Sequence, residues 1–173
     1  EDSSYQDRFY ENRDGRFVLN RGALPPFLVS GSCVRAADYD QDGDLDLFIG
    51  GRQVPLHYPL PANSYFLRNE SDKEHIEFVI DGEASALMED FGMVTDALWT
   101  DFNNDGSTDL ILAGEWMPIS FLQNTKGTFR NVTATSGVGE NVGWLNSLTS
   151  GDFDGDGDED YVAGNLGLNT INR

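Results

Sequence analysis

One nine-residue acidic pattern occurs three times in this chain of 173 residues, and it constrains the fold more than any other feature. The copies span residues 38–46, 101–109 and 152–160. Each has Asp or Asn at positions one, three and five, Gly at position six and Asp at position nine. Oxygen ligands on alternate residues, with a Gly for the sharp turn, are what a calcium ion requires. We therefore expect three short loops that each offer several oxygens to Ca²⁺.

Short strand-like runs lie on both sides of each acidic copy, so we expect each copy to form the tip of a β-hairpin. The runs before the copies are 33–37, 95–99 and 147–150, and those after them are 45–51, 110–114 and 161–164. A helix–loop–helix calcium site has helices on both sides and Glu at position twelve. Because strands flank these loops and Asp stands at position nine, we reject that class of site.

A second kind of hairpin consists of aromatic-rich runs separated by a polar turn, often Asp-Gly or Lys-Gly. Three such pairs are 7–12 with 16–19, 64–69 with 76–80, and 119–124 with 128–132. Each repeat then holds four short strands and no convincing helix, which is typical of a β-propeller blade. The repeat periods of 63 and 51 residues exceed the length of a typical blade, so we expect expanded loops at 52–63 and 81–90.

We therefore predict an all-β fold for residues 1–173, a partial β-propeller of about three four-stranded blades with calcium loops at its hairpin tips. Its parts would be an outer hairpin at 7–19, repeats at 33–80 and 95–132, and an inner hairpin at 147–164. Propellers close with about 4–8 blades. Either the natural protein is longer, or a homodimer of two copies completes the propeller with about six blades.

The acidic pattern, followed by Leu and then by Gly-Gly or Ala-Gly, resembles the FG-GAP (VCBS) repeat. That repeat builds the β-propeller of integrin α chains and of many secreted bacterial proteins. Phe91-Gly92 and residues 12–17 resemble further landmarks of the repeat, so the resemblance extends over nearly the whole chain. Residues 114–116 and 164–169 also resemble the bacterial relatives of cartilage acidic protein.

The resemblance implies that four side chains and one carbonyl in each loop hold Ca²⁺. The implied ligands are Asp38, Asp40, Asp42, Asp46 and the Asp44 carbonyl; Asp101, Asn103, Asp105, Asp109 and the Ser107 carbonyl; and Asp152, Asp154, Asp156, Asp160 and the Asp158 carbonyl. Neutral Asn103 should lower the affinity of the second loop, since charge count tunes calcium binding. The alternative is Asx-turns that cap the hairpins without metal. Three copies in register favour calcium, because crowded carboxylates repel one another without a cation.

The net charge limits the kinds of partner that the protein can bind, and the calcium loops indicate where it is located. Asp and Glu number 30 against 11 Lys and Arg, for a formal charge of −19, which argues against nucleic acid or an anionic membrane as a partner. No apolar run approaches the ~18 residues of a membrane helix, so we expect no membrane insertion. Calcium sites of modest affinity fill where calcium is plentiful. We therefore expect an extracellular, periplasmic or cell-surface location.

Residues outside the loops give no pattern for catalysis. His57 and His75 stand apart from Cys33 and from carboxylate pairs, and no nucleophile elbow is present. We expect a binding module for a protein or glycan ligand and not an enzyme, with the ligand on the top face or in the central channel, as the resemblance implies. The alternative is a polysaccharide-active enzyme or its accessory domain, which a catalytic base outside the loops would favour.

The three tryptophans are expected to pack between blades. The alternative is that exposed aromatic rings stack on sugars, and for that role Trp116 and Trp144 are the better candidates.

Overall fold

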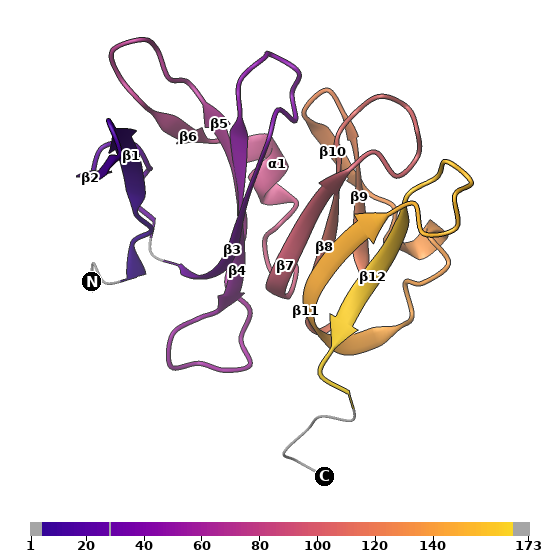
Figure 1. Ribbon diagram of the computed structural model, residues 1–173. Helices are drawn as coiled ribbons and strands as arrows, with labels where there is room; N and C mark the ends of the chain where they lie inside the picture. The colour runs from indigo at the N-terminus through magenta and orange to yellow at the C-terminus, as the bar shows by residue number, and fades with distance from the viewer. Residues whose placement is uncertain (1–4, 28, 168–173) are drawn as a thin grey trace.

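The computed structural model describes residues 5–27 and 29–167, and the regular secondary structure of this part of the chain is almost entirely antiparallel strand (Figure 1). The domain expected over 1–173 thus extends beyond the described residues. The strands are β1 (Phe9–Arg13), β2 (Arg16–Asn20), β3 (Ser30–Ala37), β4 (Asp46–Gln53), β5 (Tyr65–Asn69), β6 (Phe78–Ile80), β7 (Met93–Thr100), β8 (Asp109–Pro118), β9 (Ser120–Thr125), β10 (Thr128–Asn131), β11 (Val142–Gly151) and β12 (Asp160–Asn165). The all-β prediction is confirmed.

Each acidic copy joins two paired strands, as predicted. The strand pairs are β3–β4, β7–β8 and β11–β12, and all three are antiparallel. In each pair the residue just before the acidic loop faces the ninth residue of that loop: Ala37 faces Asp46, Thr100 faces Asp109 and Gly151 faces Asp160. The repeated sequence pattern therefore produces a repeated hairpin register.

The aromatic-rich hairpins also form as predicted, as β1–β2, β5–β6 and β9–β10. Strands β3 to β6 make one four-stranded sheet in chain order. Strands β7 to β10 repeat that order inside a larger sheet, in which β11 also pairs with the end of β8. None of the sheets in the described part of the chain is closed.

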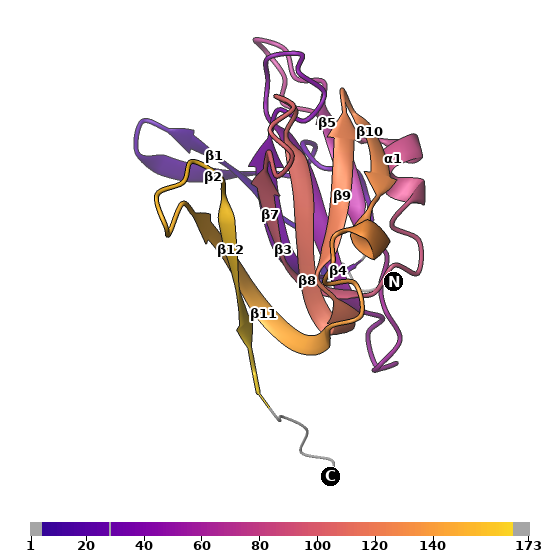
Figure 2. The ribbon, with the colours of Figure 1, turned by 90° about the vertical axis from the view of Figure 1, so that its right-hand side faces the viewer.

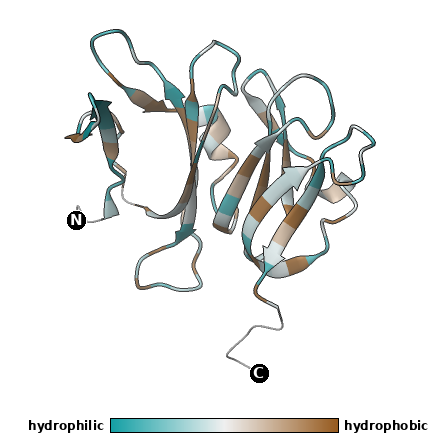
Figure 3. Ribbon diagram, in the orientation of Figure 1, coloured by the Kyte–Doolittle hydropathy of each residue, from teal (hydrophilic) through white to brown (hydrophobic). Residues whose placement is uncertain are grey.

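The two repeats share one hydrophobic core. Buried aromatic and aliphatic side chains from both sheets form the main cluster, and Tyr39 stacks on Trp99 with ring centroids 5.9 Å apart. Phe66 of the first repeat stacks on Phe129 of the second at 4.5 Å. In Figures 1 and 2 the first sheet, strands β7 to β10 and the β11–β12 hairpin follow one another in space. Figure 3 shows hydrophobic residues in the strands and hydrophilic residues in the loops at their ends.

One buried carboxylate ties together the strands that precede the three loops. Asp96 of β7 forms an ion pair with Arg35 of β3, and its second oxygen accepts a hydrogen bond of 2.8 Å from the Leu148 backbone N–H of β11. Arg35 also donates to the Ala97 carbonyl at 2.9 Å. These bonds hold the hairpins side by side, so their acidic loops project from the same side of the molecule (Figure 1).

The expectation of no helix is wrong at one place. The segment predicted as an expanded loop at 81–90 contains a short helix, α1 (Gly82–Ala86), and a 3₁₀ turn, η2 (Thr133–Thr135), follows β10. Asp81 caps α1 by accepting hydrogen bonds from the Glu83 and Ala84 N–H groups, a role that Asp often fills. None of the helices in the described residues has the length and apolar character that crossing a membrane requires.

Candidate metal sites

The three acidic loops share one backbone conformation. Position four has a positive φ in every loop, at 66° for Gln41, 56° for Asn104 and 81° for Gly155. The Gly at position six also has a positive φ in every loop. Such angles are costly for most side chains, and Gly and Asn tolerate them best. The shared pattern of residue types thus produces the same tight turn in all three loops.

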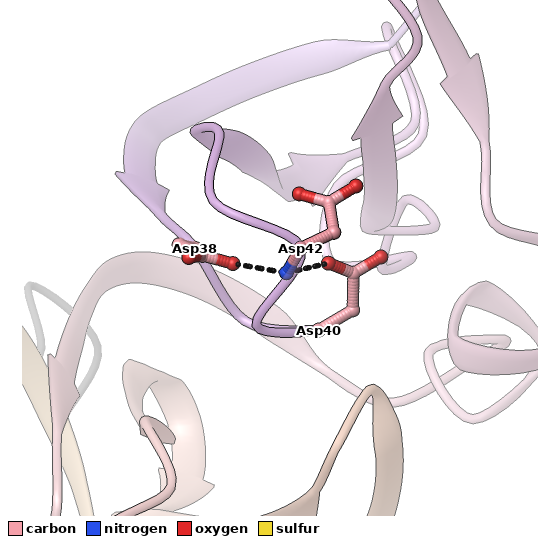
Figure 4. Close-up of side chains that lie close together, drawn as sticks. All are labelled: Asp38, Asp40 and Asp42. Carbon is pink, nitrogen blue, oxygen red and sulfur yellow. Dashed lines mark hydrogen bonds between the residues drawn. The ribbon is translucent and has the colours of Figure 1, made fainter.

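In the first loop, backbone N–H groups hold the carboxylates in place. The Asp42 N–H donates to Asp38 at 3.1 Å and to Asp40 at 3.2 Å (Figure 4). The Gly43 N–H donates to the other oxygen of Asp38 at 3.1 Å, and the Asp44 N–H donates to Asp42 at 3.1 Å. The loop is therefore wrapped around its own carboxylates, which fixes the directions of the oxygens that remain free.

The same four hydrogen bonds recur in the other two loops. In the second loop they run from Asp105 to Asp101 and Asn103, from Gly106 to Asp101, and from Ser107 to Asp105. In the third they run from Asp156 to Asp152 and Asp154, from Gly157 to Asp152, and from Asp158 to Asp156. The predicted ligands at positions one, three and five are thus brought together in every loop.

Carboxylate oxygens converge in the first and third loops. Asp38, Asp40 and Asp42 each offer an oxygen within 4.8 Å of the others, and so do Asp152, Asp154 and Asp156. In the second loop the Asn103 amide donates instead to Asp105 at 2.9 Å. Exposed acidic clusters of this kind are common without an ion, so convergence alone does not establish a metal.

Position nine differs between the loops. Asp46 and Asp109 have no exposed surface, and each accepts a hydrogen bond from a strand outside its own hairpin. The Asn69 N–H donates to Asp46 at 2.9 Å and the Asn124 N–H donates to Asp109 at 2.7 Å. Asp160 is exposed and accepts from the Phe153 N–H at 3.1 Å.

Burial changes the acidity of the two buried carboxyls. It raises the pKa of Asp46 to about 6, with Asp40 and Asp42 adding repulsion. It raises the pKa of Asp109 to about 6 as well, with Asp105 and Asp101 adding repulsion. Both groups therefore sit where a negative charge is unfavourable unless a cation lies nearby.

Two buried oxygens, one in the first acidic loop and one in the second, are suited to bind a cation. Oδ2 of Asp109 and Oδ1 of Asp44 have no hydrogen-bond partner among residues 5–27 and 29–167. A buried polar group left without a partner costs about 1–3 kcal/mol, and more when charged. Sequence reasoning assigns Asp44 only its carbonyl, so the shielded Oδ1 of this half-buried residue is an additional oxygen that it missed. The roles of the Asp44, Ser107 and Asp158 carbonyls remain predictions.

Neighbouring loops also touch. The Gln41 amide of the first loop donates to the Gly106 carbonyl of the second at 3.0 Å. The Asn104 amide of the second loop donates to Asp158 of the third at 3.1 Å. Sequence reasoning did not find these contacts, although both donors occupy position four of their loops. The three candidate sites thus form a connected row.

Comparison with known proteins gives a family match to the second and third loops of this row. The FG-GAP-like repeat family matches residues 101–163, which include the second and third acidic loops. No curated protein matches the chain. The VCBS label and the relation to cartilage acidic protein remain predictions, and Leu168 and Asn169 of the segment that suggested the latter lie outside the described residues. Residues 101–163 of this chain are therefore similar to an FG-GAP-like repeat.

Proposed function

We propose that the chain is a calcium-stabilised binding module at an extracellular, periplasmic or cell-surface location. A calcium ion binds within each acidic loop, and a protein or glycan ligand binds elsewhere on the protein. The observation that carries the calcium proposal is Oδ2 of Asp109, a buried and unpartnered oxygen in a loop whose other carboxylates are already oriented.

Electrostatics supports the same proposal. Several carboxylates in one loop repel one another, and burial of Asp46 and Asp109 makes the repulsion more costly. Three calcium ions would add six positive charges and bring the formal charge from −19 to −13. The ions would be held by the side chains at positions one, three, five and nine and by the carbonyl at position seven of each loop, the set that the resemblance to the FG-GAP (VCBS) repeat implies.

A partial β-propeller is the architecture that we propose around these sites. Its support is the repeated strand order β3 to β6 and β7 to β10, together with the lateral contacts of β3, β7 and β11. The β1–β2 and β11–β12 hairpins would belong to incomplete blades. Their strands expose apolar side chains, including Phe17 at 72% and Val162 at 52%. Further blades of a longer protein, or those of a second copy, would cover them.

Light scattering at several concentrations tests the dimer. A homodimer that completes the propeller has twice the mass of the chain, and it slows amide exchange in the 7–19 hairpin. A monomer at every concentration, with rapid exchange in that hairpin, argues against the dimer.

An enzyme acting on polysaccharide is the second candidate, because a fully buried carboxylate, Glu115, lies outside the acidic loops. Arg52 already forms an ion pair with Glu115. A cavity of about 290 Å³ beside the 54–62 segment has Asp90 as its one lining carboxylate. Glycosidases usually act through two carboxylates that flank the scissile bond. Binding is therefore the function that we favour.

Calorimetric titration of calcium into chelator-treated protein, with metal analysis of the product, tests the proposal. We expect up to three bound ions. The matched variant Asp109→Asn should lose one of them, while Asp90→Asn, outside the loops, should lose none. Absence of bound calcium in the folded wild-type protein would refute the proposal.

A further inference from the structure

An aromatic cluster lies at the far end of the strands from the acidic loops. Strands β4 and β8 begin at Asp46 and Asp109, and six residues later they reach Arg52 and Glu115. At about 3.3 Å per residue this is roughly 20 Å from the position-nine carboxylates. Tyr58, Trp116 and Trp144 lie next to this pair, and we call them the aromatic cluster.

A chain of polar contacts that begins at buried Glu115 fixes the positions of Tyr58 and Trp116. Arg52 Nε donates to Glu115 at 2.6 Å, and the other oxygen of Glu115 lies 3.4 Å from the Tyr58 hydroxyl. The Trp116 indole N–H donates to the same hydroxyl at 3.1 Å. The Glu115 side chain is fully buried, so it anchors this chain from a fixed position. The rings of Tyr58 and Trp116 are therefore held in place before any ligand arrives.

The backbone also turns Trp116 outward at a conformational cost. Its φ is +59°, which is an outlier for a bulky side chain. Strand β11 pairs Gly143 with Met117 and Trp144 with Glu115, so Trp116 is the extra residue of a bulge. Bulges often redirect a side chain next to a functional site. Strain of this kind persists where surrounding structure holds it in place, and it is concentrated at binding and active sites.

The result is a solvent-facing aromatic platform and not a packed interface. Trp116 is 48% exposed and Tyr58 is 51% exposed. Trp116 therefore does not pack fully between strands of the described residues as expected, although it contacts Trp144 of β11, whereas Trp99 is partly buried against the core. The rings of Trp116 and Trp144 lie 5.4 Å apart and are tilted by 51°. Because the two rings touch, they offer one angled platform for a single small ring.

We propose that this platform binds one ring of an uncharged carbohydrate. This deepens the proposed binding function, on which it rests, by assigning the ligand class and the site. The C–H face of a pyranose is apolar and would lie on the Trp116 ring, whose aromatic face is suited to apolar contact. Its hydroxyls lie at the edge of the ring. The half-exposed Arg52 guanidinium uses two of its N–H groups on Glu115 and has others for such hydroxyls.

Local charge favours an uncharged ligand. Arg52 and Glu115 neutralise each other at the platform. A quaternary ammonium group, the other common partner of aromatic clusters, would meet the exposed guanidinium and find no exposed carboxylate on Glu115. A polyanionic chain would face the formal charge of −19. A neutral sugar avoids both penalties.

Calorimetry and tryptophan fluorescence with cellohexaose, mannohexaose and xylohexaose, in calcium buffer, test the proposal. We expect at least one neutral hexasaccharide to bind and to change the fluorescence. Trp116→Ala should weaken its binding on the order of tenfold, a typical loss for a central Trp. Tyr58→Phe keeps the ring but loses the hydroxyl bridge, so it should weaken binding a few-fold. Tyr10→Ala is the matched control, because Tyr10 is a 49% exposed aromatic on β1.

The other outcomes overturn the proposal. They are binding of none of the neutral sugars by folded protein, binding unaffected by Trp116→Ala and Tyr58→Phe, or binding of trimethylammonium compounds in place of sugars. Melting curves recorded for every variant show that each is folded. Calcium content is measured separately, so failure of the calcium proposal and failure of the sugar proposal are distinguished.

Discussion

The first two acidic loops and the third have the same sequence pattern and the same internal hydrogen bonds, but they differ in what lies behind them. Behind the first two, β5 and β9 bury the ninth residue, and Asn69 and Asn124 donate to it. The ninth residue of the third loop, Asp160, is exposed. The loop motif thus sets the geometry of the carboxylates, whereas the neighbouring strand sets how far they are desolvated.

Desolvation determines how much each loop depends on a cation. A buried carboxylate that cannot reach water needs an opposite charge, and the raised pKa values of Asp46 and Asp109 express this need. The exposed carboxylates of the third loop are screened by solvent. We therefore expect calcium to stabilise the whole core through the first two loops, and mainly to order the hairpin tip in the third.

Removing calcium should have the largest effect. Binding to the native state alone stabilises by about 2.7 kcal/mol per site at a hundredfold excess over Kd. Two sites coupled to the core would then shift the melting temperature by on the order of 10–20 °C. Thermal melts with excess calcium and with excess chelator measure the shift. Identical melting curves in both buffers would contradict the predicted role of the first two loops.

Substitution at position nine tests the comparison directly. Asp109→Asn replaces a charged calcium ligand with a neutral one, so with calcium present it should destabilise the fold by roughly 1–3 kcal/mol. In chelator it removes a buried charge while its amide oxygen can still accept from the Asn124 N–H, so the destabilisation should vanish or reverse. Asp160→Asn is the matched control in the exposed loop.

Denaturant unfolding of the wild type and both variants, with calcium and with chelator, gives the six free energies of unfolding from which the effects are calculated. Equal effects of Asp109→Asn and Asp160→Asn in both buffers would mean that burial does not distinguish the loops.

The hairpins could be predicted from sequence because their signals are local. Alternating apolar residues, Asp-Gly turns and the acidic repeat determine strands and loops within short windows, and the pairs β3–β4, β7–β8 and β11–β12 form as predicted. Helix α1 has a local signal too, an Asp81 cap before Ala-containing residues, but the repeat pattern outweighed it in our interpretation.

The differences between equivalent positions could not be predicted, because they depend on distant strands. The burial of Asp46 and Asp109 requires β5 and β9, and no residue inside the loops encodes it. The outward turn of Trp116 depends on how β11 pairs with the end of β8. The contacts of Gln41 and Asn104 arise only when the hairpins lie side by side.

The charge of position three should have a moderate effect. Asn103→Asp gives the second loop the same acidic residues as the first at positions one, three, five and nine, so its calcium affinity should rise severalfold, since charge count tunes such sites. Asp156→Ala removes a charged ligand from the third loop and should weaken its site more than Asn103→Ala weakens the second. Calorimetric titration compares the three variants. An unchanged or lower affinity in Asn103→Asp would show that the amide of Asn103 is required as it stands.

The contacts between loops should have the smallest effect, and they determine whether the buried and exposed loops act separately. The Asn104 amide donates to Asp158, so order in the second loop helps to orient the third. Asn104→Gly keeps a residue that tolerates the positive φ at this position but removes the amide. We expect it to weaken calcium binding in the third loop by a few-fold, about the 0.5–1.5 kcal/mol of one hydrogen bond. Gln41→Gly should do the same to the second loop through the Gly106 carbonyl.

Calcium titration followed by NMR, which reports on each loop separately, measures these effects. If each substitution weakened only the loop that carries it, the sites would be independent, and the difference between buried and exposed loops would be a property of each hairpin alone.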